Sequence, residues 1–152
     1  MSNITFTLKS FEDFTASELY RVLQLRSAVF VVEQDCVYQD IDGKDQKALH
    51  VLGYKGDQLI AYTRIFKAGD YFKEASIGRV VVMDSQRKYG YGYDLMKATV
   101  AAIYTELGEQ DIRISAQTYL MNFYNKLGFQ ETGETYLEDG IPHINMVKRK
   151  RT

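Results

Sequence analysis

Residues 86–92 read QRKYGYG and stand between a predicted strand, which carries the apolar run 80–82, and a predicted helix. Backbone N–H groups at the start of a helix point outward and carry a partial positive charge. Glycine lets such a backbone approach an anion closely, because it has no Cβ, and both Gly90 and Gly92 lie in this stretch. The stretch therefore predicts a phosphate-binding loop at the start of the helix.

Two cations, Arg87 and Lys88, border the predicted loop. A hydrogen bond to a charged group contributes about 1.5–3 kcal/mol, whereas an exposed ion pair contributes about 0–1 kcal/mol. We therefore expect the backbone amides to supply most of the phosphate affinity and Lys88 mainly to tune it.

Three other interpretations of the loop compete with this one. A Walker loop needs Gly-Lys-Ser/Thr, but tyrosine and aspartate follow Gly92. A dinucleotide fingerprint needs a third glycine where Leu95 stands, and an acidic residue near the end of the next strand, where 116–117 are alanine and glutamine. A tight strand-to-helix turn that uses glycine for geometry alone stays open from the loop by itself.

Hydrophobic periodicity divides the rest of the chain into strands and helices. Thr15 and Glu18 fit a capping box that starts a helix, and the turns at 56–57 and 139–140 join hairpins. Strands and helices alternate in the second half, so part of the sheet is expected to be parallel. The sequence thus predicts an α/β (α+β mixed) fold with a central mixed, twisted sheet flanked by helices. The expected strands are 4–8, 49–54, 58–66, 77–83, 112–116, 129–136 and 141–148, and the expected helices follow Thr15 and span 92–107 and 119–127.

Length and composition favour one soluble globular domain, 1–152. Nineteen Lys and Arg oppose twenty Asp and Glu, and this net charge of -1 argues against a nucleic-acid partner. The basic end 148–151 is interpreted as a solvated terminus. No apolar stretch reaches the ~20 residues needed to cross a membrane, the N-terminus lacks a signal-peptide pattern, and a single cysteine, Cys36, excludes an internal disulfide. A cytoplasmic location is expected.

Two motifs in order resemble the GNAT superfamily of N-acetyltransferases. That family carries Gln/Arg-x-x-Gly-x-Gly/Ala after a central strand, which Arg87, Gly90 and Gly92 match. Its second motif ends in Tyr-x-Lys-x-Gly-Phe, which residues 124–129, YNKLGF, match, with Asn122 just before them. Together the motifs cover roughly residues 77 to 130. The flanking stretches 29–34 with Cys36, His50, 77–82 and 136–143 resemble a narrower ElaA-like subgroup.

The resemblance implies a GNAT-like acyl-CoA N-acyltransferase fold, with acetyl-CoA or another acyl-CoA as donor and no metal. The loop would hold the pyrophosphate, and the backbone of Val80 and Val82 would pair with the pantetheine arm. Tyr124 would be the general acid, because a phenol of pKa about 10 can protonate a departing thiolate of pKa about 8.5 when both are held close. The expected cofactor-binding residues are Val80, Val82, Arg87, Lys88, Gly90, Tyr91, Gly92 and Asn122.

The acceptor side is less determined by the sequence. A lysine-like amine has a pKa of about 10.4, so a base must remove its proton, and a strand N–H beside Val82 would stabilise the oxyanion. The candidate bases are Glu33, His50, Glu138 and His143, the last two also being candidate substrate-binding residues. Arg26, Arg64 and Arg79 either line the acceptor pocket, in which case the acceptor would carry an acid group, or pair internally with Glu33, Asp40 or Asp42.

Other patterns leave two further hypotheses. Cys36 beside a histidine would permit a covalent acyl-enzyme, although a lone cysteine is usually a small packed residue. The acidic loop 40–45 imitates a calcium loop but lacks its glycine and glutamate, Val51 standing at the latter place, so we interpret it as solvated.

The main hypothesis is transfer to a small-molecule or protein amine. The alternative is a non-catalytic acyl-CoA sensor on the same fold, and a homodimer is left open.

Overall fold

A seven-stranded mixed sheet forms the centre of the protein in the computed structural model, which describes residues 3–150. The strand order is β1-β2-β3-β4-β5-β7-β6, and β4 and β5 are the one parallel pair within this sheet. The apolar run at 80–82 lies on the middle strand, as its continuous hydrophobicity predicts. The strands are β1 (Ile4–Ser10), β2 (Leu49–Lys55), β3 (Gln58–Phe66), β4 (Ala75–Val82), β5 (Ile112–Gln117), β6 (Gln130–Glu138) and β7 (Ile141–Lys148).

Helix α1 (Ala16–Arg26) begins at the predicted capping box. The Thr15 hydroxyl accepts from the Glu18 N–H at 3.1 Å, and the Glu18 carboxylate accepts from the Thr15 N–H at 2.9 Å. The helix does not end at Arg26 but continues as a π-helix, η2 (Ser27–Glu33), which the sequence did not predict. This extension matters for function because its last turns reach the candidate site.

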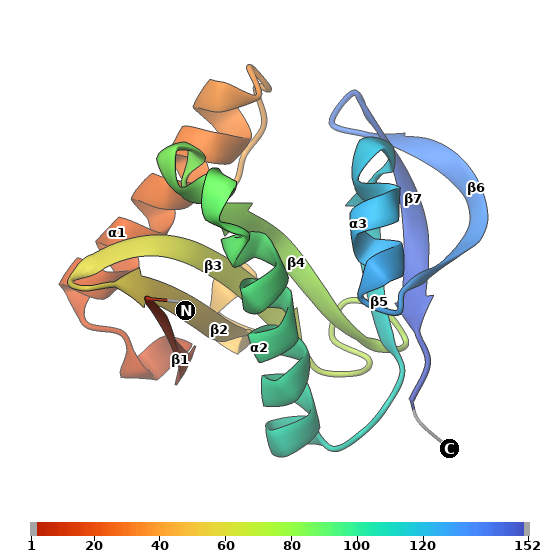
Figure 1. The fold of residues 1–152 in the computed structure, drawn as a ribbon, viewed down its shortest axis with the longest axis horizontal. Helices are drawn as coiled ribbons and strands as arrows, with labels where there is room; N and C mark the ends of the chain where they lie inside the picture. The colour runs from red at the N-terminus through yellow and green to blue at the C-terminus, as the bar shows by residue number, and fades with distance from the viewer. Residues whose placement is uncertain (1–2, 151–152) are drawn as a thin grey trace.

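Helices cover both faces of the sheet (Figure 1). Helix α2 (Tyr91–Leu107) packs Leu95 and Ile103 into one apolar core, and α1 packs Val22 into a second. Neighbouring residues of β3, Ala61 and Tyr62, belong to the first and second core respectively, as the alternation of side chains in a strand requires. None of the helices within residues 3–150 is long and apolar enough to span a membrane.

The predicted last helix is shorter than expected. A 3-10 turn (Thr118–Leu120) precedes α3 (Met121–Lys126), which ends before Leu127. Gly128 follows with a φ of 95°, a left-handed conformation that favours glycine and turns the chain into β6. Of the basic end, Arg149 pairs with Asp111 at 3.1 Å, while residue 151 lies outside the described residues.

The sheet is split at its only parallel junction. Strands β4 and β5 pair only through Ala75 with Ile112 and Ser76 with Arg113, and then diverge (Figure 1). In β4 an extra residue forms a bulge, because Tyr62 pairs with Val81 but Arg64 pairs with Gly78. The bulge contains Arg79, whose φ of 49° is uncommon for a residue with a side chain. The split leaves the second half of β4 without a strand partner on the side of β5, and this is where the candidate site lies.

Candidate active site

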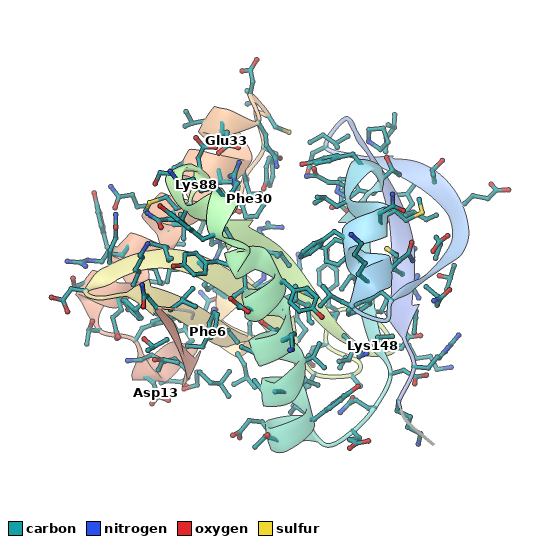
Figure 2. The ribbon with its side chains drawn as sticks, viewed as in Figure 1. Phe6, Asp13, Phe30, Glu33, Lys88 and Lys148 are labelled. Atoms are coloured by element: carbon teal, nitrogen blue, oxygen red, sulfur yellow. The ribbon has the colours of Figure 1, made fainter. Side chains whose placement is uncertain are left out.

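A cavity of about 600 Å³ occupies the split between β4 and β5. Residues of η2, β4, the start of α2, β5, the segment 119–124 and the β6–β7 turn line it. Figure 2 labels Phe30 and Glu33 of η2 and Lys88 of the predicted phosphate loop, whose neighbour Arg87 pairs with Glu33. Phe30 and Glu33 line the cavity. Three residues of the predicted phosphate loop and four of the predicted acceptor residues line this same cavity: Arg87, Gly90 and Gly92, and Glu33, Arg79, Glu138 and His143.

The backbone of β4 presents polar groups to this cavity at Val82. The Met83 N–H donates to the Ile60 carbonyl at 2.7 Å, so Met83 faces β3. Successive residues of an antiparallel strand face their partner strand alternately, which directs the N–H and carbonyl of Val82 away from β3. Consistently, Arg87 Nε donates to the Val82 carbonyl at 3.0 Å. Val80 and Val82 both line the cavity, and their pairing with the pantetheine arm stays a prediction.

The predicted phosphate loop is a 3-10 turn (Asp84–Tyr89) followed by Gly90 and the start of α2. Gly90 has a φ of 75°, which favours glycine, and no side chain caps the helix N-terminus. Gly90 and Gly92 line the cavity, but Lys88 and Tyr91 do not. Lys88 is exposed with its ammonium 5.3 Å from the centre of the Tyr89 ring, and Tyr91 is buried. Neither residue lines the cavity, and their part in binding the cofactor stays a prediction.

Arg87 and Glu33 form a two-bond ion pair at the edge of the cavity. The Nη1–Oε2 distance is 2.5 Å and the Nη2–Oε1 distance is 2.8 Å. The hydrogen bond to Glu33 raises the pKa of Arg87. Both carboxylate oxygens of Glu33 therefore bind the Arg87 guanidinium, and Glu33 is not a free base. Asn122 is exposed on α3 and is not among the residues that line the cavity, so its contact with the cofactor stays a prediction.

Tyr124 lies against the cavity and is almost fully buried, with 5% of its surface exposed. Phe123 and Phe129 meet its ring edge to face, with centroid distances of 5.1 and 6.0 Å. Burial raises the pKa of Tyr124 well above its ordinary value, so the phenol stays protonated at neutral pH. Within residues 3–150 its hydroxyl has no hydrogen-bond partner, which leaves it available to a ligand.

His143 and Glu138 face each other on the opposite wall of the cavity. His143 Nδ1 lies 2.7 Å from the Ile141 carbonyl, which can only accept, so Nδ1 carries the hydrogen. In the neutral ring Nε2 then holds the free lone pair, and it lies 3.5 Å from a Glu138 carboxylate oxygen. Ser115 donates to the other oxygen of Glu138 at 3.2 Å. Of the four candidate bases, His143 is the one with a free nitrogen oriented by a second contact.

His50 and Arg64 do not line the cavity, which corrects their assignment as base and substrate-binding residue. The His50 ring is buried, with its nitrogens 2.5 Å from the Tyr62 hydroxyl and 3.0 Å from the Asp45 carbonyl. Burial lowers its pKa, so the ring is neutral. Both of its nitrogens serve the core, and none is left for an acceptor.

A buried network of ion pairs joins α1, the acidic loop, β3 and the β4 bulge. Its three arginines pair with carboxylates of the protein itself, which is the internal pairing that the sequence left as an alternative to lining the acceptor pocket. Of the three, only Arg79 also lines the cavity. Asp40 and Asp45 are buried, so the loop is not the solvated segment that the sequence suggested. The pairs are Arg26 with Asp40 (2.9 Å) and Asp45 (2.8 Å), Arg64 with Asp42 (2.8 Å) and Asp45 (2.9 Å), and Arg79 with Asp40 (2.7 Å) and Asp42 (3.4 Å).

This network predicts acid sensitivity. Burial alone would raise the pKa of Asp42 and Asp45, but the ion pairs with Arg64 and Arg26 lower both below the ordinary 3.8. Their stabilising contribution is therefore complete above pH ~4 and is lost as the pH falls through the folded-state pKa. Urea unfolding should give a free energy that declines steadily below pH ~4. An Asp42→Asn variant should be less stable than the parent at neutral pH, and its unfolding free energy should fall less between pH ~7 and ~3. Equal stability of the parent protein at pH ~3 and ~7 would contradict the prediction.

The cavity also contains residues that sequence reasoning did not name. Gln34, Tyr38 and Gln117 contribute side chains to its lining, and Asp139 contributes from the β6–β7 turn. Gln34 and Asp139 fall inside the stretches 29–34 and 136–143 that carry the subgroup resemblance, which is the signal that would have identified them.

Comparisons with known proteins agree on one family. A family model described as an acetyltransferase (GNAT) domain matches residues 12–150. The protein ElaA of Escherichia coli K12 is 45% identical over 138 residues, which is 90% of each chain. The crystal structure of Escherichia coli ElaA matches with a TM-score of 0.89 and 42% identity over 96% of this chain and 99% of that one. An acyl-CoA N-acyltransferase from Pseudomonas aeruginosa matches with a TM-score of 0.89 and 39% identity, over 95% and 99%.

Proposed function

This chain belongs to the GNAT acetyltransferase family, and from that premise we propose that it transfers an acyl group, in the simplest case acetyl, from acyl-CoA to a primary amine. One observation carries the proposal. A single cavity is bordered by the Arg87–Gly92 loop, by the buried phenol of Tyr124 and by the oriented imidazole of His143. These are the groups that donor binding, leaving-group protonation and amine deprotonation require.

The lining fits an acyl-CoA donor. The uncapped start of α2, with Gly90 and Gly92, suits the pyrophosphate, and the open edge of β4 around Val80 and Val82, which β5 does not pair, suits an amide-bearing arm. The cavity volume of about 600 Å³ lies within the usual range of ligand sites. The donor supplies an acyl group activated as a thioester.

The chain's own residues supply the proton transfers. His143 Nε2 accepts the proton of the attacking amine, directly or through water, and the nearby Glu138 carboxylate stabilises the imidazolium. The N–H of Val82 donates to the carbonyl oxygen as charge develops on it. As the new C–N bond forms and the C–S bond breaks, Tyr124 gives its proton to the departing sulfur. Cys36 donates its thiol hydrogen to the Asp139 carbonyl at 3.2 Å, and direct attack needs no covalent step through it.

The test is thiol release from acetyl-CoA on incubation with a panel of amines. We expect turnover with at least one amine. An Arg87→Leu variant should raise the KM for acetyl-CoA about tenfold, because it leaves the Glu33 carboxylate without its cation beside the phosphate loop. Lys88→Leu removes the same charge outside the cavity and is the matched control, with a smaller expected change. Tight CoA binding without thiol release on any amine would instead favour the non-catalytic sensor.

A further inference from the structure

The two arginines that line the cavity are both neutralised by carboxylates. Arg87 is held by Glu33, and Arg79 is held by Asp40 and Asp42. Within residues 3–150, no lysine lines the cavity. An acceptor that carries a carboxylate would therefore find no unpaired cation on this wall, which argues against the acidic acceptor that the arginines suggested from sequence alone.

The acceptor end carries carboxylates that lack a cation. Glu138 and Asp139 both line the cavity at the β6–β7 turn. Glu138 is 44% exposed and contacts His143 and Ser115. Neither carboxylate forms an ion pair with a lysine or arginine anywhere in residues 3–150. The acceptor end is thus negative, while the start of α2 gives the donor end a positive character.

Two contacts cross the cavity and enclose this end. The Cys36 thiol donates to the Asp139 carbonyl at 3.2 Å, and Gln117 donates to Gln34 at 3.5 Å. They connect the segment after α1 with β5 and the β6–β7 turn. Such bridging leaves room for a slender chain rather than for a folded polypeptide, and the aromatic ring of Phe30 offers an apolar wall to methylene groups.

We propose that the acceptor is a small aliphatic diamine, whose second ammonium binds Glu138 and Asp139 while its first amine is acylated. The inference rests on the proposed function. The reacting nitrogen forms the amide bond as the thioester C–S bond breaks, and the second ammonium keeps its protons. A carboxylate in place of that ammonium would meet like charge, and a methyl group would leave both acids without a partner.

The test compares cadaverine, n-hexylamine and ε-aminocaproate, which share one methylene spacer and differ only in their end group. Affinity is measured by calorimetry with CoA present, and kcat/KM is measured with acetyl-CoA. We expect cadaverine to exceed n-hexylamine about tenfold in both, as a charge-assisted contact implies, and ε-aminocaproate to be the weakest. Equal affinity of cadaverine and n-hexylamine, or preference for ε-aminocaproate, would overturn the inference.

The double variant Glu138→Gln, Asp139→Asn assigns the preference to these carboxylates. Asparagine tolerates the φ of 52° at Asp139, so the turn should be retained. The ratio between cadaverine and n-hexylamine should fall to about one, whereas loss of support for His143 alone would slow both acceptors equally. If the double variant keeps the preference for cadaverine over n-hexylamine, Glu138 and Asp139 are not the carboxylates that bind the second ammonium. A charge-dependent binding preference without turnover on any amine would reject the proposed function but keep the binding inference.

Discussion

A Tyr124→Phe protein should turn over about 10²-fold more slowly than the parent while binding CoA with nearly unchanged affinity. The substitution removes one hydroxyl from a buried ring whose position is set by Phe123 and Phe129, so the fold and the cavity should be retained. General acid catalysis contributes about 10²–10⁴-fold. The lower value is expected because a thiolate of pKa about 8.5 is already a good leaving group. Steady-state rates and calorimetric CoA affinity measure the two quantities.

Tyr119→Phe is the matched control for this experiment. Tyr119 also lines the cavity, but it is 72% exposed. The same chemical change there should leave kcat within about twofold, since an exposed hydroxyl remains solvated and contributes little. Equal rates for the Tyr124→Phe protein and the parent would remove Tyr124 from its role, and a parallel loss of CoA affinity would make it a binding residue.

An Arg26→Met protein should lose about 3 kcal/mol of unfolding free energy. Arg26 is fully buried and donates to Asp40, to its backbone carbonyl and to Asp45. Methionine fills a similar volume but leaves both aspartates with one cation each, Arg79 and Arg64 respectively. Removing one partner of a buried pair costs about 3–5 kcal/mol, and the remaining arginines place the expected loss at the lower end. Urea unfolding at neutral pH measures it.

Lys9→Met provides the comparison for an ion pair that is only partly buried. Lys9 pairs with Glu18 at 2.7 Å, and Glu18 keeps its hydrogen bond to the Thr15 backbone when the lysine is absent. We expect a much smaller loss of stability than for Arg26→Met, because water replaces the lost ion pair. If the two variants were equally stable, the buried network would not be a main source of stability.

The strand, turn and helix start around the predicted phosphate loop could be predicted from the sequence because their determinants are local. A buried strand, a turn with two glycines and a helix start follow one another within residues 80–92, so hydrogen-bonding geometry fixes their arrangement. The capping box at Thr15 and the turn at 139–140 are local in the same sense. The position of Tyr124 in the site followed from the second motif rather than from periodicity.

The acceptor side could not be predicted in this way, because its determinants are contacts between distant segments. The pairing of Arg64 with Asp42 and the role of His50 in the core depend on how the acidic loop folds against β2 and β3. The π-helix η2 was missed because its apolar residues follow neither the helical nor the strand period. Glu33 consequently reaches Arg87, 54 residues away in the chain.

The narrow junction between β4 and β5 has a mechanical consequence. Only two residue pairs join these strands, so few backbone hydrogen bonds connect β1–β4 with β5–β7 beside the cavity. The two parts of the sheet are joined near one end of β4 and β5 and separate toward the other end. Any molecule held by both parts adds its binding free energy to their cohesion. A ligand in the cavity should therefore raise the free energy that is needed to separate β4 from β5 locally.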